Sequence, residues 1–148
     1  MLIDNLTRVD NAHAYSANAV STSSYDTAAA GNDISIGQPM CFVVTVGAAA
    51  KVSGGTETYE FDIIQSANAA LTAPDVLAAF TFTNAQAVAL LTLGAAIQLP
   101  IPMGSITKRF LGLQFVGANT PTITITSWIT PQSMQDRTHI YGTRIVVL

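Results

Sequence analysis

The 148-residue chain is predicted to be an all-β protein, one antiparallel β-sandwich of the jelly-roll type with at most short helical turns. Two observations predict this fold: apolar and polar side chains alternate with a period of two in the readable segments, and clusters of Gly, Pro, Ser and Asn separate these segments. About eight short strands without a helical layer pack most economically as two sheets. We expect residues 1–148 to form a single domain.

Four segments show the alternation of a strand most clearly. They are residues 40–47, 57–65, 110–116 and 122–129. The first is apolar on both faces, so both faces are expected to be covered. In the second, large apolar side chains point one way and Glu60 and Asp62 the other, which predicts a half-exposed strand with its acidic face in solvent.

Two turn-forming clusters predict how these strands are connected. Residues 117–121 read Gly-Ala-Asn-Thr-Pro, and we expect them to join residues 110–116 and 122–129 in a hairpin. Gly54 and Gly55 tolerate the positive φ of a tight reversal, which predicts a second hairpin between residues 40–47 and 57–65.

Weaker patterns complete the expected fold. Further strands are expected at residues 19–25, 79–83, 96–101 and 143–147, and short helical turns at residues 73–77 and 85–91. The two ends are expected to form extended arms. The N-terminal arm is residues 1–12, and the C-terminal arm is residues 133–148, whose apolar end suits addition to a neighbour's sheet.

Charged residues are scarce. They make up 10% of the chain, whereas hydrophobic residues make up 49%, and an ordinary domain carries about 25% charged residues. Lys and Glu are depleted from interface cores because desolvating them is costly, so permanent assembly explains the composition. A secreted or lectin-like β domain, in which Thr and Ser follow β propensity, is the alternative.

The charge pattern excludes two kinds of partner. Net charge is −3 and the largest basic cluster is Lys108 with Arg109, so we expect no nucleic-acid partner. Residues 76–107 are uncharged, but Pro100 and Pro102 interrupt them, so we expect no membrane span. The N-terminus lacks a basic region followed by an apolar core, which predicts no secretory signal.

Catalytic and metal-binding patterns are not found in the sequence. His13, His139 and Cys41 lie in no recognised nucleophile, zinc or phosphate-binding motif, so we expect no enzyme activity, no cofactor and no metal. Cys41 stands in an apolar alternating run and is expected to pack as a small hydrophobic residue. The acidic group at residues 57–62 is expected to be a solvated face rather than a calcium or glycosidase site.

Several segments resemble one known family in their order and spacing. They are the start Met-Leu-Ile-Asp-Asn-Leu, residues 33–40 (Asp-Ile-Ser-Ile-Gly-Gln-Pro-Met), residues 94–102, residues 109–115 (Arg-Phe-Leu-Gly-Leu-Gln-Phe) and residues 130–132 (Thr-Pro-Gln). Together these segments resemble the capsid cement, or decoration, proteins of tailed bacteriophages, a jelly-roll family typified by the cement protein of short-tailed Bordetella phages. Residues 133–148 fit the family less well.

The resemblance implies a structural virion protein that is made in the host cytoplasm. Such a protein binds the outer surface of the capsid and bridges major capsid subunits, and its partners are the major capsid protein and further copies of itself, with a dimer favoured and a trimer possible. The alternative is a carbohydrate- or receptor-binding jelly-roll protein of a virion tail or fibre.

Candidate contact residues follow from these expectations. Leu2, Ile3 and Leu6 are a candidate anchoring arm. Arg109 is expected to donate several hydrogen bonds at a strand start or a subunit contact, because its planar guanidinium makes paired contacts that Lys108 cannot. Trp128 is a candidate interface residue, and an exposed Trp128 beside Asp or Asn in a groove would instead favour carbohydrate binding.

Overall fold

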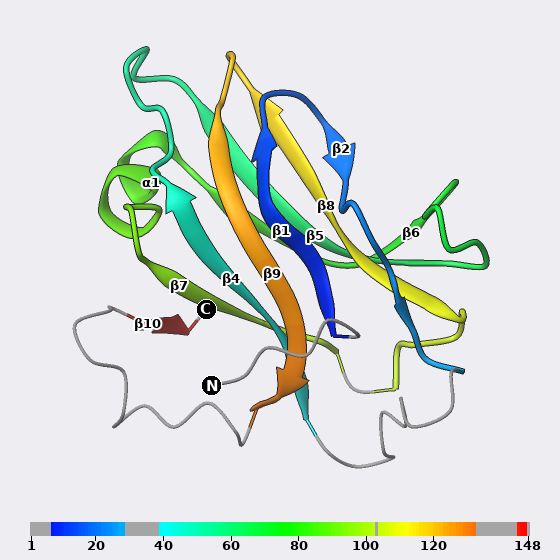
Figure 1. The fold of residues 1–148 in the computed structure, drawn as a ribbon. Helices are drawn as coiled ribbons and strands as arrows, with labels where there is room; N and C mark the ends of the chain where they lie inside the picture. The colour runs from blue at the N-terminus through cyan, green and yellow to red at the C-terminus, as the bar shows by residue number, and fades with distance from the viewer. Residues whose placement is uncertain (1–6, 29–38, 103, 133–144, 148) are drawn as a thin grey trace.

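The computed structural model describes residues 7–28, 39–102, 104–132 and 145–147. Two β-sheets lie face to face as a sandwich, and the described part of the chain contains one short helix at its side (Figure 1). The elements are β1 (Arg8–Tyr15), β2 (Ala19–Val20), β3 (Tyr25–Asp26), β4 (Met40–Ala48), β5 (Thr58–Ser66), β6 (Asp75–Phe82), α1 (Asn84–Leu90), β7 (Ala96–Pro100), β8 (Phe110–Ala118), β9 (Ile123–Pro131) and β10 (Ile145–Val147).

The strands form two sheets, each with its own strand order. Sheet A has the order β1-β9-β4-β7-β10, and sheet B has the order β2-β8-β5-β6, with β3 also paired to β8. The described pairs are antiparallel except for β7 and β10, which run parallel. The predicted all-β sandwich of the jelly-roll type is confirmed.

The core lies between the sheets because each central strand turns alternate apolar side chains inward. On β4 these are Phe42, Val44 and Val46, which are buried and belong to one apolar cluster with the inward residues of β5 and β8. Phe115 is at the centre of the aromatic part of this cluster, with ring centroids of Tyr15 at 5.1 Å and of Phe61 at 5.8 Å. Burying each such side chain contributes about 1.5–3 kcal/mol to folding.

Both predicted hairpins are wrong. The four strands lie where the alternation predicted them, but β4 pairs with β9 and β5 pairs with β8. The connections from β4 to β5 and from β8 to β9 therefore cross from one sheet to the other. They run side by side, since the Lys51 N–H donates to the Thr122 carbonyl at 2.9 Å. Turn-forming residues predict that the chain reverses, but not in which sheet it continues.

The weaker elements are confirmed in part. Residues 85–91 were expected to be helical, and α1 occupies Asn84–Leu90 behind a capping box of Thr83 and Gln86. The helical turn expected at residues 73–77 is wrong, because Ala73 has φ 45° and β6 begins at Asp75. The strand expected at residues 19–25 is divided into β2 and β3.

The N-terminal strand was not expected. Residues 8–12 of the predicted arm are the first part of β1, which pairs with β9. Register shifts between Arg8 and Asp10 and between Asp10 and His13, with φ 49° at Ala12, break the alternation that would reveal a strand in the sequence. Residues 1–6 and 133–144 of the two predicted arms lie outside the described residues. Residues 145–147 form β10 at the edge of sheet A in their own chain.

The acidic face of β5 is not solvated as predicted. Asp62 is 4% exposed and Ile64, two residues on along the same face, is fully buried. This face points away from the core, and Leu71 from the loop after β5 packs over it against Gly112. The loop covers a face that alternation alone marks as exposed.

Candidate functional site

The outer face of sheet A carries no charged side chain on its three central strands. It consists of three rows across β7, β4 and β9: Pro100, Cys41 and Thr130; Gln98, Val43 and Trp128; Ala96, Thr45 and Thr126. The three strands contain no Asp, Glu, Lys, Arg or His. A face without ions is suited to permanent contact, because no charge has to be desolvated.

The rows of this face differ in burial. In the row of Val43, Trp128 is 6% exposed and Gln98 is buried, and Cys41 in the adjoining row is fully buried. Burial raises the pKa of the Cys41 thiol to about 11, so Cys41 packs as a small apolar residue, as predicted. The indole N–H of Trp128 is buried and has no acceptor among the described residues.

The row of Thr45 is half-buried and neutral but polar. The Thr45 hydroxyl donates to the Thr126 carbonyl at 3.1 Å. The Thr126 hydroxyl in turn accepts from the Ala12 N–H at 2.9 Å, where β1 bulges. Hydrogen bonds within the sheet thus hold these side chains in place, and the row presents methyl groups and hydroxyls to its surroundings.

Arg109 lies on the other sheet, immediately before β8. Its Nε and Nη2 donate to the two carboxylate oxygens of Asp26, each at 2.8 Å, and its guanidinium lies 5.1 Å from the ring centroid of Phe110. Hydrogen bonding to Asp26 raises the pKa of Arg109. The paired hydrogen bonds at a strand start agree with the prediction. The described structure does not bring Arg109 and Trp128 together.

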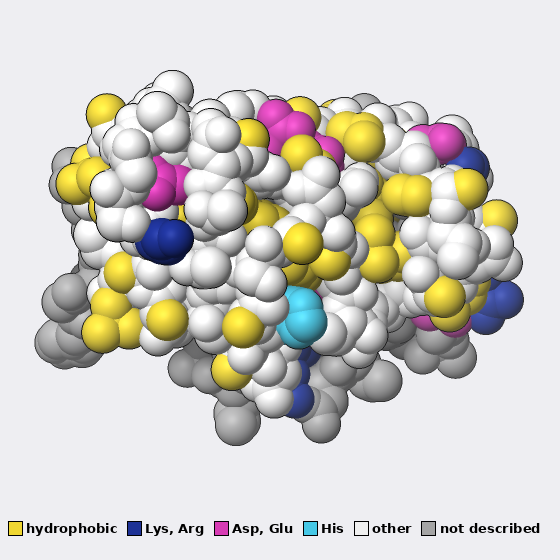
Figure 2. Space-filling model, turned by 90° about the horizontal axis from the view of Figure 1, so that it is seen from above, with side chains coloured by type: hydrophobic (Ala, Val, Ile, Leu, Met, Phe, Trp, Pro, Cys, Tyr) yellow, Lys and Arg dark blue, Asp and Glu magenta, His cyan; other side chains and the backbone are white. Residues whose placement is uncertain are grey.

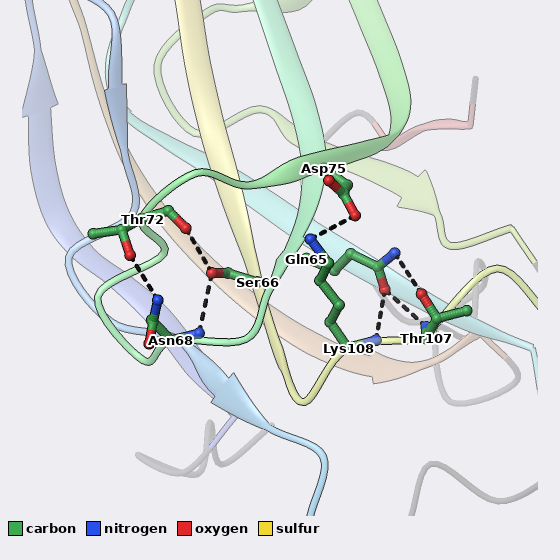
Figure 3. Close-up of polar contacts among 7 residues, drawn as sticks. All are labelled: Gln65, Ser66, Asn68, Thr72, Asp75, Thr107 and Lys108. Atoms are coloured by element: carbon green, nitrogen blue, oxygen red, sulfur yellow. Dashed lines mark hydrogen bonds and ion pairs between the residues drawn. The ribbon is translucent and has the colours of Figure 1, made fainter.

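A second ion pair lies at the same end of sheet B. Lys108 Nζ is 2.7 Å from Asp75 Oδ2, which joins the start of β8 to the start of β6 (Figure 3). Buried Gln65 lies beneath it: its Oε1 accepts from the Thr107 N–H at 2.8 Å and from the Lys108 N–H at 3.0 Å. We call Asp26, Arg109, Lys108 and Asp75 the ion-pair end of sheet B.

A polar loop packs next to the ion-pair end. Ser66 Oγ donates to the Thr72 carbonyl at 2.8 Å and accepts from the Asn68 N–H at 3.1 Å (Figure 3). Asn68 Nδ2 also donates to Thr72 Oγ1 at 2.9 Å. The loop that carries Leu71 over the outer face of sheet B is therefore closed by its own hydrogen bonds.

The acidic group of residues 57–62 is divided among three environments. Glu57 accepts from the Gly54 N–H at 2.6 Å, and this bond lowers the pKa of its carboxyl. Glu60 accepts from the Thr81 hydroxyl at 2.6 Å. Asp62 is buried, which raises its pKa to about 6. The three carboxylates therefore do not converge on a common ligand.

Asp10 is a buried carboxylate at the edge of the sandwich. It accepts from the Tyr15 hydroxyl at 3.1 Å, the Thr22 N–H at 3.0 Å and the Ser127 hydroxyl at 2.8 Å. An open hollow of about 300 Å³ lies beside it and is lined by Arg8, Val9, Asp10, Asn11, Thr22 and Ser23. Because its donors come from the chain itself, Asp10 is satisfied as a structural group.

Chemistry-bearing side chains are dispersed over the described residues. No three of their His, Cys, Asp and Glu side chains lie close enough to hold a metal ion. His13 packs edge to face on Tyr15, with ring centroids 4.4 Å apart. His139 lies outside the described residues. Within the described ranges, no helix has the length and apolar character to span a membrane.

Charged side chains on the surface are correspondingly sparse. Seen from above, they lie singly or in small groups, separated by hydrophobic and neutral polar side chains (Figure 2). The uncharged face of sheet A was not assembled from the sequence as one surface. The sequence does contain the signal for this face, because residues 40–47, 96–101 and 122–129 each lack charge.

The sequence model of the Bbp16 family matches residues 9–127, from β1 to β9. The chain belongs to the Bbp16 family. Bbp16 is a family of Bordetella phage proteins, so the resemblance to a Bordetella phage protein family is confirmed. No curated protein matches the chain.

The Bbp16 match covers most of the sandwich and only part of the candidate residues. It contains the ion-pair end of sheet B with Arg109, and most of the outer face of sheet A. Trp128 directly follows the matched range, and Leu2, Ile3 and Leu6 precede it. The last three lie outside the described residues.

Proposed function

We propose that this Bbp16-family chain is a capsid cement protein, which binds the outer surface of a phage shell and bridges major capsid subunits. The observation that carries the proposal is the uncharged outer face of sheet A on a phage-family jelly roll. Bridging requires binding energy and no chemistry. It is also consistent with the dispersed titratable side chains of the described residues.

The row of Ala96, Thr45 and Thr126 is the proposed contact with the capsid. Its side chains are half-buried in the free chain, so they retain surface for a partner, whereas the row of Val43 is already buried. Neutral hydroxyls and methyl groups are less costly to desolvate than ions. A contact of this kind persists at high salt, because it does not depend on ion pairs that salt screens.

Self-association is the second part of the proposal, with a dimer favoured over a trimer. Strand β6 is at the edge of sheet B and has no charged residue after Asp75. An uncharged edge strand pairs readily with a copy of itself, and the antiparallel arrangement satisfies a two-fold axis. A bivalent cement protein would link two capsid sites without a third component.

Trp128 gives no support to the alternative of a carbohydrate-binding tail or fibre protein. Stacking on a sugar needs an exposed aromatic ring, and Trp128 is 6% exposed. Its neighbours on the outer face, Val43 and Cys41, are apolar and buried, so the surroundings also differ from the groove with Asp or Asn that would favour carbohydrate binding.

Cryo-electron microscopy of the virion tests the cement role. Ordered density for this chain on the shell lattice, in contact with more than one major capsid subunit, is the expected result. Density confined to the tail or fibres would refute the proposal and favour receptor binding.

A matched pair of variants tests the contact surface. Thr45 lies on the outer face of sheet A, and Thr56 is an exposed threonine in the loop before β5, outside both β6 and sheet A. Purified T45K and T56K are added to shells that lack the protein, and bound copies are counted. We expect T45K to lose binding and T56K to retain it. Equal binding by two folded variants would show that the outer face of sheet A is not the contact.

A further inference from the structure

A second apolar cluster lies on the outer face of sheet A, which faces away from the core between the sheets. Cys41, Val43 and Trp128 form a cluster of buried residues that is separate from the main core. Their side chains point outward, since the neighbouring Phe42 and Val44 point inward. The described residues contribute no further apolar side chain to this cluster. A buried outward cluster requires a covering layer.

The unpaired indole N–H of Trp128 indicates that this cover carries an acceptor. Trp128 is 6% exposed, and its Nε1 has no partner among the described residues. A buried donor is normally hydrogen-bonded, because leaving it unpaired is costly. The missing layer therefore presents apolar side chains and at least one oxygen.

The N-terminus enters the sheet directly beside the cluster. Arg8 is the Cα partner of Trp128, and the Ile129 N–H donates to the Thr7 carbonyl at 2.9 Å. If this pairing continues by one residue, position 6 stands opposite Thr130, which is itself the partner of Cys41. By alternation, position 6 is then on the outer face, as Arg8 and Trp128 are.

The composition and length of residues 1–6 suit the cluster. They read Met-Leu-Ile-Asp-Asn-Leu, so apolar side chains predominate and backbone carbonyls are available as acceptors. Extended, six residues reach about 20 Å. The cluster is nearer, since neighbouring strands lie about 4.8 Å apart. Tethering gives this segment a high effective concentration at the cluster, which favours it over a segment of another copy.

We propose that residues 1–6 dock on the Cys41, Val43 and Trp128 cluster of their own chain and complete the outer face of sheet A. Leu2, Ile3 and Leu6 are the apolar anchors, and a carbonyl of the segment accepts from the Trp128 N–H. These three side chains then pack within their own chain and do not anchor it to the capsid, which was the role expected from the sequence. This inference does not depend on the cement role.

The chain carries two single-copy probes of this docking. Trp128 is its one Trp and Cys41 its one Cys, so fluorescence emission and thiol modification each report on the cluster alone. In the full chain we expect blue-shifted emission, weak quenching by iodide and slow modification of Cys41. Deleting residues 2–6 is expected to shift the emission to the red and to accelerate modification at least about tenfold, which corresponds to about 1.4 kcal/mol of lost protection.

Point variants keep the test valid if the deletion variant does not fold. The triple variant Leu2→Ser, Ile3→Ser and Leu6→Ser retains the chain length and is expected to give the same two changes, with circular dichroism confirming the fold. The matched control replaces Thr7 by Ser, which preserves its carbonyl acceptor for Ile129. Trp128 and Cys41 should be as protected in this control as in the full chain.

Three results would overturn the inference. The first is unchanged emission and Cys41 reactivity in both folded N-terminal variants. The second is exposure of both probes after deletion of residues 133–148 but not of residues 2–6, which would assign the cover to the C-terminal segment. The third is exposure of the probes in the full chain on dilution, which would assign the cover to a second copy.

Discussion

The hydroxyl of Tyr59, at the start of β5, donates a hydrogen bond to the backbone carbonyl of Lys51. Lys51 lies in the connection that takes the chain from sheet A to sheet B. The same hydroxyl is 3.4 Å from the carbonyl oxygen of Thr122, in the connection that returns the chain from sheet B to sheet A. One side chain from the core thus joins the two crossings that define the topology.

Replacing Tyr59 by Phe should weaken the corner where Tyr59 joins the two connections between the sheets. The ring stays in the core, but the Lys51 carbonyl loses its donor, so we expect the free energy of unfolding to fall by about 1 kcal/mol. Urea unfolding measures the change. Thr81→Val, which removes a hydroxyl at the exposed edge of sheet B, is the control and should change stability by less than about 0.5 kcal/mol. Equal effects in the two variants would contradict a special role for the corner.

Gly117 in β8 should not accept a side chain. A Cβ at this position would lie 2.2 Å from Pro121 Cγ and 3.0 Å from Phe115 Cζ. Because the proline ring is rigid, Gly117→Ala is expected to cost about 1–3 kcal/mol. Gly47→Ala in β4 is the matched control, since its nearest contact would be an ordinary 3.6 Å.

The same steric argument predicts a rescue. In a chain that already carries Pro121→Ala, the cost of Gly117→Ala should shrink, and thermal unfolding of the four combinations measures the coupling. Additive losses would mean that another neighbour limits this position.

Asp10 and Tyr15 should behave as a coupled pair. Asp10→Asn leaves buried donors facing an amide, and we expect a loss of about 2–4 kcal/mol, against about 1–2 kcal/mol for Tyr15→Phe. Desolvation, followed by the charge of Asp10, raises the pKa of Tyr15. Tyr15 should therefore stay protonated at a pH that ionises exposed tyrosines, and difference spectra of Tyr15→Phe against the parent chain check this. A double-mutant cycle without coupling would refute the pairing.

Asp62 should make the protein less stable as the pH rises from about 4 to about 6. Burial, together with a smaller effect of the charge of Glu60, raises the pKa of this carboxyl to about 6 in the folded chain. The folded state therefore binds a proton that the unfolded state has already released in this window, so stability is highest at its acidic end.

The variant Asp62→Asn removes this contribution to the pH dependence of stability. Asp62→Asn removes a buried charge whose Oδ1 has no partner among the described residues, so we expect it to be more stable than the parent by about 1–2 kcal/mol at pH 7.5. At pH 4 the two proteins should be nearly equal. Urea unfolding at both pH values measures this, and a stability difference independent of pH would exclude a raised pKa.

The sequence by itself was sufficient to locate the central strands. It also predicted the burial or hydrogen bonding of some candidate residues. Alternation is a property of one strand, so residues 40–47, 57–65, 110–116 and 122–129 correspond to β4, β5, β8 and β9. The apolar run around Cys41 likewise predicted its burial, and the guanidinium chemistry of Arg109 predicted its paired hydrogen bonds. Each of these predictions depends on residues close together in the chain.

Only the tertiary structure decided which strands share a sheet and which outward faces are covered. β4 pairs with β9 and β5 with β8, so the chain crosses between the sheets at both connections, and no local turn signal encodes that choice. Asp62 and Trp128 stand on outward faces by alternation, yet both are buried. Alternation describes one strand only, whereas the burial of an outward face depends on what packs over it, as Leu71 does where it packs against Gly112.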